Sequence, residues 1–391
     1  MQKTSLHKIV LFASLVLILL SVPLGLIVFE LGQNIKAIGL ILIVLGIVYS
    51  NRTNVFFYAL ILLIFYIVFL GFYREIHINQ LFESGIRYCL PIIALLYGLQ
   101  LRTYKKPILT ILITFIVLND VYQLLNWLIS PIFNNTFSYH LERASGFVGF
   151  FDFFGFINMI GLVLINHTNE LNFKKKTKLT LSIFFTLFVI WSLSLKMIVI
   201  LVFYILFFQR RLLFLAIPTI PLIIIFHGRL KDAISIRLNR YIIKPSSARS
   251  ESYRVLKDYY EDFITFGQGP GTFGGPVSTK YNSLLYEKYN FNWFGEQAMA
   301  TTDTYYPHLF VELGLFFGVF YLFICLILPI ISLKKKMLAF LILSILAINS
   351  VFSFAFNSLP YCLFSFMLIY LINEVNFDLN ALKFYKGKKN K

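Results

Sequence analysis

The chain alternates between long apolar runs and short polar segments along almost its whole length. We expect each apolar run to be a membrane-spanning helix, because a span needs about 20 predominantly apolar residues. The twelve runs are Ile9–Phe29, Ile35–Tyr49, Val55–Phe72, Ile86–Leu101, Pro107–Ile129, Phe147–Ile165, Leu179–Leu195, Met197–Phe208, Leu212–Phe226, Tyr305–Ile331, Met337–Phe354 and Leu359–Asn373. The eighth run is short, so we expect a broken helix there or one fused to its neighbour. The pattern predicts an all-α integral membrane protein with about 12 transmembrane helices.

Basic residues between the runs predict the direction of each span. The connections alternate between basic ones and short ones that are nearly without Lys and Arg. The basic residues are Lys3, Lys8, Arg52, Arg102, Lys105, Lys106, Lys174, Lys175, Lys176, Lys178, Arg210, Arg211, Lys334, Lys335, Lys336 and those of the tail 383–391. Because cytoplasmic loops carry an excess of Lys and Arg, both termini are predicted to be cytoplasmic.

One long polar segment, residues 228–304, breaks the alternation. It is predicted to be an extracytoplasmic loop, and loops longer than about 60 residues escape the positive-inside rule. Long structured loops are usually functional, so we look for a site there first. The predicted organisation is 1–227 for helices 1–9, 228–304 for the loop, 305–373 for helices 10–12 and 374–391 for a basic cytoplasmic tail.

Composition excludes several classes of protein. Hydrophobic residues make up 58% of the 391 residues and charged residues 14%, with a mean hydropathy of +0.77. Soluble proteins average about 45–50% apolar and about 25% charged, so an ordinary soluble enzyme is excluded. The net charge of +17 lies in clusters between apolar runs rather than on one continuous basic face, which argues against nucleic-acid binding. Cys89, Cys325 and Cys362 have no metal-ligand spacing and are interpreted as core residues, so they predict no metal site; no cofactor is expected either.

The long loop holds two patterns of chemical interest. Arg237, Arg240 and Lys244 would share one face of a helix, and Val255–Ile264 has the pattern of an amphipathic helix. The glycine-rich turn 267–275 can point backbone N–H groups at an anion, or it is an ordinary surface turn. It is not a Walker loop, since no Gly-Lys-Ser/Thr follows.

Polar residues inside the predicted spans have two interpretations each. Asp303 is expected at the outer interface and Glu312 about two turns deeper, where a charge costs roughly 2.5–3.5 kcal/mol and marks a site unless it pairs with an arginine. Two further helical faces either line a polar cavity or join helices by hydrogen bonds. They are Asn119, Asp120, Gln123 and Asn126 in the fifth run, and Asn349, Ser350, Ser353 and Asn357 near the end of the eleventh.

Cationic residues recur at the predicted outer face. They are Arg143, Lys196, Arg249 and Arg254. Lys196 could simply extend to the interface and Arg143 could be an interfacial anchor. Arginine nonetheless offers fixed, forked donors that suit phosphate oxygens. With Asp303 and His308 close in sequence, the set favours a transfer reaction on a lipid phosphate.

Three local motifs resemble the bacterial O-antigen polymerase and O-antigen ligase family, which includes capsular and exopolysaccharide polymerases. The first is Arg249, then Tyr253, then the turn Phe266–Phe273 with Gly267 and Gly269. The second is Asp303-Thr304-Tyr305-Tyr306, followed by Glu312-Leu313-Gly314 and Gly318. The third is Arg143-Ala144-Ser145-Gly146-Phe147 with Asp152. Lys196 stands where family members often have arginine. The family's ligases carry a histidine where Asp303 stands, which favours a polymerase here.

The resemblance implies a reaction and a role for each residue. A polyprenyl-pyrophosphate-linked oligosaccharide would donate its glycan to an acceptor sugar at the outer face of the bacterial cytoplasmic membrane. Arg249 would be catalytic together with Asp303 or His308, which would orient or deprotonate the acceptor hydroxyl. Substrate binding would fall to Arg143, Lys196, Tyr253, Arg254, Gly267, Gly269 and Glu312.

The apolar runs predict a lipid bilayer as the environment, and the resemblance implies a flippase and a chain-length regulator as partners. Three alternatives remain open. One is a ligase-type transferase. Another is a flippase or transporter, against which the halves show no clear repeat. The last is a membrane glycosyltransferase with an acidic pair in the first outer loop, which the short segment 30–34 lacks.

Overall fold

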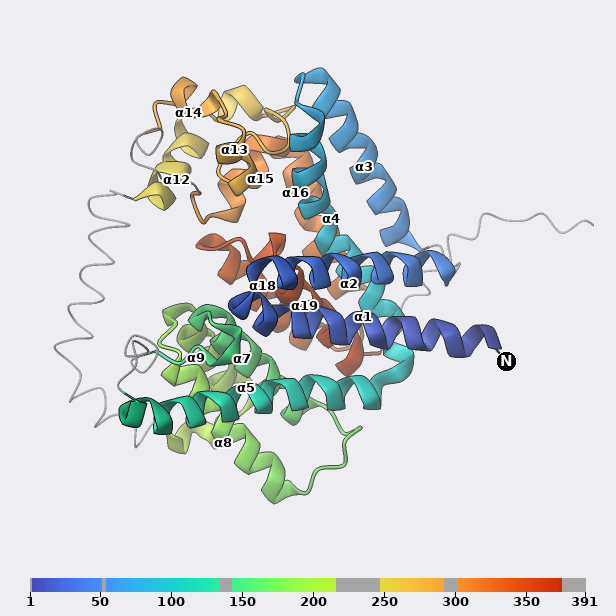
Figure 1. Ribbon diagram of the computed structural model, residues 1–391, viewed down its shortest axis with the longest axis vertical. Coiled ribbons are helices and arrows are strands. Elements are labelled where there is room, and N and C mark those ends of the chain that lie inside the picture. The colour runs from blue at the N-terminus through green and yellow to red at the C-terminus, as the bar shows by residue number, and fades with distance from the viewer. Residues whose placement is uncertain (1, 51–53, 134–142, 216–246, 292–300, 375–391) are drawn as a thin grey trace, which may run out of the picture.

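The computed structural model describes residues 2–50, 54–133, 143–215, 247–291 and 301–374, and its elements in these ranges are helices (Figure 1). The α-helices are α1 (Gln2–Ile27), α2 (Phe29–Tyr49), α3 (Val55–Tyr73), α4 (Ile78–Leu101), α5 (Lys105–Phe133), α7 (Phe151–His167), α8 (Lys175–Trp191), α9 (Leu195–Phe208), α12 (Ala248–Asp258), α13 (Pro276–Lys280), α14 (Leu285–Lys288), α15 (Tyr305–Leu313), α16 (Leu315–Leu322), α17 (Leu328–Ile331), α18 (Lys336–Val351) and α19 (Leu359–Ile372). The predicted all-α class is confirmed for these ranges.

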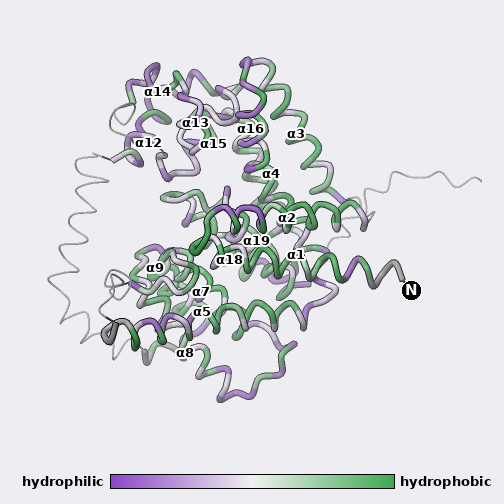
Figure 2. The backbone as a smooth tube through the Cα atoms, in the orientation of Figure 1, coloured by the Kyte–Doolittle hydropathy of each residue, from purple (hydrophilic) through white to green (hydrophobic). Residues whose placement is uncertain are grey.

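The apolar helices identify a membrane protein. In the described ranges, four helical stretches are long and apolar enough to cross a bilayer, namely Leu6–Ile27, Phe29–Tyr49, Val55–Tyr73 and Ile78–Ile129. Their outward side chains are apolar, as Phe65 and Phe72 of α3 show. Figure 2 shows this apolar colouring along α1, α2 and α3, while the segments around α12 and α14 are more polar. A lipid bilayer is therefore the environment of the chain.

The other apolar helices are shorter than the hydropathy pattern suggested. They are Phe151–His167, Leu195–Phe208, Leu315–Ile331, Lys336–Val351 and Leu359–Ile372. A 14-residue helix rises only about 21 Å, against about 30 Å of hydrocarbon. Most of the predicted ninth run, Leu212–Phe226, lies outside the described residues, as do Arg237, Arg240 and Lys244. The count of about 12 spans and the cytoplasmic termini stay predictions.

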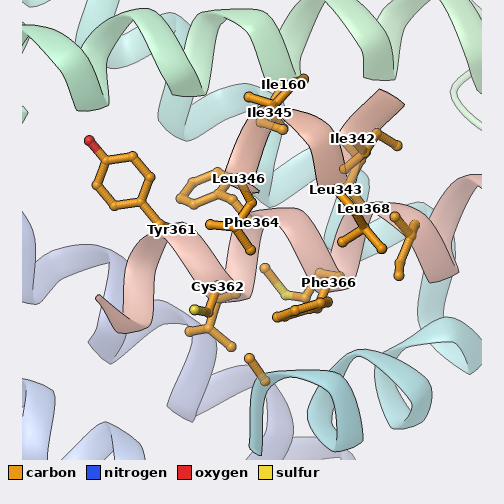
Figure 3. Packing of buried hydrophobic residues seen from close by; sticks show 14 of the residues in the cluster. Ile160, Ile342, Leu343, Ile345, Leu346, Tyr361, Cys362, Phe364, Phe366 and Leu368 are labelled. Carbon is orange, nitrogen blue, oxygen red and sulfur yellow. The ribbon is translucent and has the colours of Figure 1, made fainter. Parts of the chain in front are cut away.

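The interior of the protein is built around α19. Every side chain from Tyr361 to Ile372 is buried, so this helix is apolar all round rather than amphipathic. Figure 3 shows its side chains packed against those of α18, with Ile160 of α7 close by. A helix enclosed in this way is a rigid support for the elements that surround it.

The tenth apolar run, predicted as one span from Tyr305 to Ile331, is broken. Helix α15 ends at Leu313, and α16 begins at Leu315. The residue between them, Gly314, has φ +88° and ψ 156°, a conformation that ends a helix and that an L side chain rarely adopts. Hydropathy could not show this break, because both halves are apolar.

The glycine-rich turn 267–275 covers the break. Its Gln268 and Gly269 N–H groups donate to the Val311 and Glu312 carbonyls at the end of α15, at 2.8 and 3.1 Å. These carbonyls would otherwise lack partners, because a helix leaves its last C=O groups unpaired. The approach is so close that a Cβ on Gly267 would lie 2.0 Å from the Glu312 carbonyl oxygen. The glycine-rich turn and the broken helix therefore form one unit.

Two further helices begin earlier than the sequence pattern predicted. Helix α4 starts at Ile78 rather than Ile86, because polar residues in its first turns contact the loop; Gln80 Nε2 donates to the Gly271 carbonyl at 2.9 Å. The amphipathic helix expected over Val255–Ile264 is instead α12. Ser247 caps it, since its Oγ accepts from the Ser250 N–H and Ser250 returns the bond.

The predicted orientation can be tested with single cysteines in otherwise unchanged protein. Lys257 is an exposed residue of α12, and Lys175 is an exposed residue of α8, so each can be replaced by cysteine. A membrane-impermeant maleimide should label Lys257→Cys in intact cells and Lys175→Cys only after permeabilisation. The three native cysteines are buried, which keeps the background low. Labelling of both positions in intact cells, or the reverse order, would contradict the orientation.

The contact between the loop and α15 predicts the effect of Gly267→Ala. The added Cβ cannot fit 2.0 Å from a backbone oxygen and 2.6 Å from the Gly314 nitrogen. We expect the free energy of unfolding to fall by about 1–3 kcal/mol or more, as is typical of overpacking. In detergent this should appear as a lower thermal midpoint and as a smaller monodisperse peak in size-exclusion chromatography. Gly85→Ala is the control, because its Cβ meets only the Ile67 side chain, at 3.2 Å, in the middle of α4. Equal behaviour of the two variants would contradict the contact.

Candidate functional site

The structure brings together Arg249 and Asp303, two predicted site residues that are 54 positions apart. Arg249 is in the first turn of α12, and Asp303 comes just before α15. Arg249 Nη2 donates to Asp303 Oδ2 at 3.2 Å. The Arg249 side chain is 33% exposed and that of Asp303 53% exposed, so a ligand can reach both.

A chain of hydroxyl groups places Asp303 beside Arg249. Thr304 Oγ1 lies 2.7 Å from Ser252 Oγ on α12 and 2.9 Å from Thr302 Oγ1. The Thr302 N–H donates to the Gly274 carbonyl at 3.0 Å. Asp303 itself has φ +50°, in the left-handed region. Side chains other than glycine rarely adopt this backbone, and strain of this kind gathers at functional sites.

A second ion pair joins the first turns of α7 and α9. Lys196 Nζ lies 3.1 Å from Asp152 Oδ2, and the two side chains are 15% and 14% exposed. Ser194, the residue before α9, donates its hydroxyl to Asp152 Oδ1 at 2.5 Å. Of these three residues, the predicted site contained only Lys196. Asp152 is its partner in the folded protein.

Arg143 lies at the same corner. Its Nη2 donates to the Leu193 carbonyl at 2.9 Å, and its guanidinium carbon lies 3.4 Å from the centre of the Phe151 ring. The turn after Arg143 is held by α5, because Gln123 Oε1 accepts from the Ser145 and Gly146 N–H groups at 3.1 and 2.8 Å. Leu193 has φ +49°, which is unusual for a bulky residue.

The two ion pairs belong to one cluster of charges. Lys196 interacts electrostatically with Arg249 and Asp303 as well as with its own partner Asp152. The predicted residues Arg143, Lys196, Arg249 and Asp303, with Asp152, therefore stand where α7, α9, α12 and α15 begin. We call these five residues the charged cluster. Helix N-termini add partial positive charge, so the environment favours an anion.

Arg254 and Tyr253 make contacts that hold the loop together. Arg254 donates to Glu251 at 2.6 and 2.8 Å and to the Tyr289 carbonyl at 2.8 Å. The hydrogen bonds to the Glu251 carboxylate raise the pKa of the Arg254 guanidinium above its usual value. Tyr253 donates to the Val351 carbonyl at the end of α18, at 2.8 Å. A direct contact of either side chain with substrate stays a prediction.

Glu312 is the anion that the glycine-rich turn binds. Its two carboxylate oxygens accept from the Gly271 N–H at 2.7 Å and the Phe273 N–H at 2.8 Å. Tyr88 Oη and Ser84 Oγ of α4 donate to Oε2 at 2.8 and 3.3 Å. Glu312 is completely buried; among the described residues its close ion-pair contact is His308, and Arg87 of α4 interacts with it electrostatically from beyond ion-pair distance.

This arrangement changes the interpretation of the glycine-rich turn. Its N–H groups can bind an anion, as expected, but Gly271 and Phe273 already donate theirs to a carboxylate of the protein. Gly267 packs against the end of α15, and a Cβ on Gly269 would meet the Ile76 side chain. Packing thus accounts for both glycines. Their contact with substrate, and that of Glu312, stays a prediction.

His308 lies one turn before Glu312 on α15, deeper than Asp303. It is 3% exposed, and Nδ1 contacts both the Phe273 carbonyl and Glu312 Oε1, the latter at 3.2 Å. Tyr88 stacks on the ring with centroids 5.5 Å apart. His308 is therefore held in one orientation by the glycine-rich turn, α4 and its own helix.

The two polar faces in the spans differ from each other. In α5, Asn119 and Gln123 accept from the turn 145–148 and Asp120 accepts from Asn158 of α7 at 2.9 Å, so this face joins helices. In α18, both amide atoms of fully buried Asn349 lack a hydrogen bond within the described residues. The question of a cavity stays open there.

Sequence reasoning missed the partners of Glu312. Tyr88 and Ser84 lie more than 200 positions away in α4, and the Gly271 and Phe273 N–H groups belong to the backbone and carry no side-chain signal. One clue was available: Gln80, Ser84 and Tyr88 are spaced four apart, which places three hydrogen-bonding side chains on one face of an apolar helix. Within the described ranges, no group of three His, Cys, Asp or Glu side chains converges to hold a metal ion.

The partly buried pair of Lys196 and Asp152 predicts coupling between two substitutions. Lys196→Met should lower the free energy of unfolding by about 1–3 kcal/mol, because it removes the cation 3.1 Å from an Asp152 carboxylate that is only 14% exposed. Asp152→Asn in the same chain should restore part of this loss, with a coupling energy of about 0.5–3 kcal/mol. Thermal unfolding in detergent measures both. Simple additivity of the two changes would show that the pair is not coupled.

The chain was compared with models of known protein families, with curated proteins and with solved structures. None of the three comparisons finds a match. The charged cluster and its surroundings are therefore the basis for the functional argument.

Proposed function

We propose that this protein polymerises oligosaccharide repeat units carried on a polyprenyl pyrophosphate, at the outer face of the bacterial cytoplasmic membrane. The product would be a surface polysaccharide such as O-antigen, capsule or exopolysaccharide. The observation that carries the proposal is the charged cluster, in which Arg249 and Asp303 meet beside Lys196. The sequence resemblance described above supports it.

The cations suit a pyrophosphate leaving group. Arginine presents planar, forked donors to phosphate oxygens, and Lys196 adds a point charge. Arg143, Lys196 and Arg249 come from three separate segments, so together they can surround a group with two phosphates. Such preorganised charge stabilises the negative charge that develops as the bond to the sugar breaks.

The surroundings suit a lipid-borne substrate. The charged cluster lies at the heads of apolar helices, where a pyrophosphate could bind while its polyprenyl tail stays in the bilayer. Asp152 and Asp303 offset part of the positive charge before substrate binds. Asp303 is 53% exposed, which leaves it accessible to an acceptor sugar.

The reaction needs no nucleotide, because the leaving group supplies the driving force. The acceptor oxygen bonds to the anomeric carbon of the donor sugar, and the bond from that carbon to the pyrophosphate oxygen breaks. The leaving polyprenyl pyrophosphate keeps the bonding electron pair. The proton of the acceptor hydroxyl passes to a base, for which Asp303 and His308 are the candidates. A flippase and a chain-length regulator are the partners that this function would require.

The proposal predicts that Arg249→Ala abolishes the polymer while the protein stays in the membrane. Loss of one electrostatic donor typically costs about 10²–10³ in rate. Complementation of a deletion strain, with surface glycan and lipid-linked intermediates resolved by gel and mass spectrometry, measures the effect. Lys257→Ala is the matched control, since it removes a cation from the exposed face of the same helix.

The deletion strain separates the proposal from its alternatives. Loss of long polymer, with single lipid-linked repeats exposed outside, is the expected result. Single repeats trapped inside would indicate a flippase, and full-length polymer left on its lipid would indicate a ligase. Normal polymer from Arg249→Ala would refute the assignment of that residue.

A further inference from the structure

An open hollow with basic walls lies where α1 begins and α4 passes into α5, two parts of the chain that lie side by side (Figure 1). Its volume is about 450 Å³, within the range of pockets that hold small molecules. The charged residues of its lining are Lys8 of α1, Arg102 of the 3₁₀ turn Arg102–Tyr104, Lys105 and Lys106 at the start of α5, and Glu170 of the α7–α8 connection. The hollow shares no residue with the charged cluster.

Aromatic packing fixes the wall that carries Lys8. The rings of Phe12 and Tyr104 meet edge to face with centroids 5.8 Å apart, which joins α1 to the junction of α4 and α5. Lys8 Nζ lies 5.8 Å from the centre of the Phe12 ring and 5.7 Å from that of Tyr104. Cation–π contacts at this distance attract an ammonium group. Lys8 is therefore held at the hollow instead of extending freely into solvent.

Hydrogen bonds fix the connection that carries Glu170. Lys178 Nζ donates to the Thr168 carbonyl at 3.2 Å and to Asn169 Oδ1 at 3.3 Å. The Glu170 N–H donates to Thr168 Oγ1 at 3.3 Å. The hollow is thus assembled from three separate parts of the chain, and it exists only in the folded protein.

The positive charge of the hollow is left without ion pairs. The ion pairs formed within the described ranges include none of its four cations. Glu374 interacts electrostatically with Lys105, but its carboxylate contacts Lys334. Four cations and the Glu170 carboxylate give the lining a formal charge of +3. Because like charges this close repel one another, a bound anion would stabilise the arrangement.

The hollow lies at the edge of the apolar part of the protein. Helix α1 is apolar enough to span a bilayer from Leu6 to Ile27, and Lys8 is in the first turn of that stretch. Leu6 and Ile9, on either side of Lys8 in the sequence, are 56% and 61% exposed. In a bilayer, hydrocarbon would cover these two side chains, and the hollow would lie at the level of the lipid phosphates.

We propose that this hollow binds the phosphate headgroup of an anionic phospholipid, such as phosphatidylglycerol. Arg102 offers forked donors to phosphate oxygens, and the lysines add point charges. Basic pockets between transmembrane helices bind lipid headgroups in this way. The acyl chains would pack along the exposed apolar residues of α1, a contact that a free phosphate ion does not make. The inference does not depend on the proposed function.

The test removes two cations from the hollow, in Arg102→Gln with Lys106→Gln. Each Lys or Arg near an anionic lipid surface contributes about 1 kcal/mol, so the first phosphatidylglycerol molecule should bind about 30-fold more weakly. Native mass spectrometry of the full-length protein in a neutral detergent, titrated with phosphatidylglycerol, measures this affinity. Lys175→Gln with Lys176→Gln is the matched control, because it removes the same charge from exposed positions of α8 outside the hollow.

A third variant, Glu170→Gln, should have the opposite effect. It removes the negative charge from the lining and with it the repulsion of the phosphate. The same titration should show phosphatidylglycerol bound about 5-fold more tightly, by the same contribution per charge. Weaker binding would contradict an anionic headgroup at this position.

The remaining outcomes also decide the proposal. Equal weakening by the two double variants would show a general effect of net charge and would overturn the site. Equal affinity of the wild-type protein for phosphatidylcholine would overturn the choice of an anionic headgroup. Displacement of phosphatidylglycerol by inorganic phosphate at equal concentration would show that free phosphate, and not a lipid, is the ligand. None of these readouts needs a sugar substrate, so they stand apart from any failure of the polymerase assay.

Discussion

The buried carboxylate of Glu312 joins the glycine-rich turn to α4 and α15. Its oxygens accept two backbone N–H groups of the glycine-rich turn and two hydroxyls of α4. Loss of any one of these hydrogen bonds would leave a buried group unpaired. An unpaired buried polar group costs about 1–3 kcal/mol, and an unpaired buried charge costs more. The turn in return supplies partners for the carbonyls at the end of α15. Glycine is needed at position 267 because the turn and α15 are in direct backbone contact there, which leaves no room for a Cβ.

This constraint places the chemistry of the molecule. The glycine-rich turn holds the C-terminal end of α15, and this fixes the position of the whole short helix. Asp303, just before its N-terminal end, therefore meets Arg249 at the start of α12. On the other side, α5 fixes the turn after Arg143, and the pair of Asp152 and Lys196 joins α7 to α9. Repulsion within the charged cluster is reduced, because Lys196 and Arg249 each pair with a carboxylate and Arg143 donates to a backbone carbonyl. The enclosed helix α19 supports the α7 and α18 elements beneath this corner.

The proposed chemistry follows from this division of labour. A pyrophosphate requires positive charge that can be reached from outside, and the charged cluster supplies it in partly exposed side chains. Proton transfer requires a base whose orientation does not change, and His308 lies between Tyr88, Phe354 and the Phe273 carbonyl. The glycine-rich turn thus contacts both candidate bases: its Phe273 carbonyl meets His308 Nδ1, and its Gly274 carbonyl accepts from the Thr302 N–H beside Asp303.

Hydropathy and charge were enough to predict an all-helical membrane protein, because lipid demands apolar side chains wherever a helix meets it. From the sequence, three cations and one acid were also predicted to lie at the same outer face, namely Arg143, Lys196, Arg249 and Asp303. It did not show that the tenth run breaks at Gly314, since apolar residues lie on both sides of the break. Nor did it show which residues pair, because the partners of Glu312 and Asp303 lie far away along the chain. Asp303 pairs with a side chain 54 positions away, and Glu312 pairs with two distant hydroxyls and with backbone N–H groups that almost every residue carries alike, so only the tertiary structure decides where they meet.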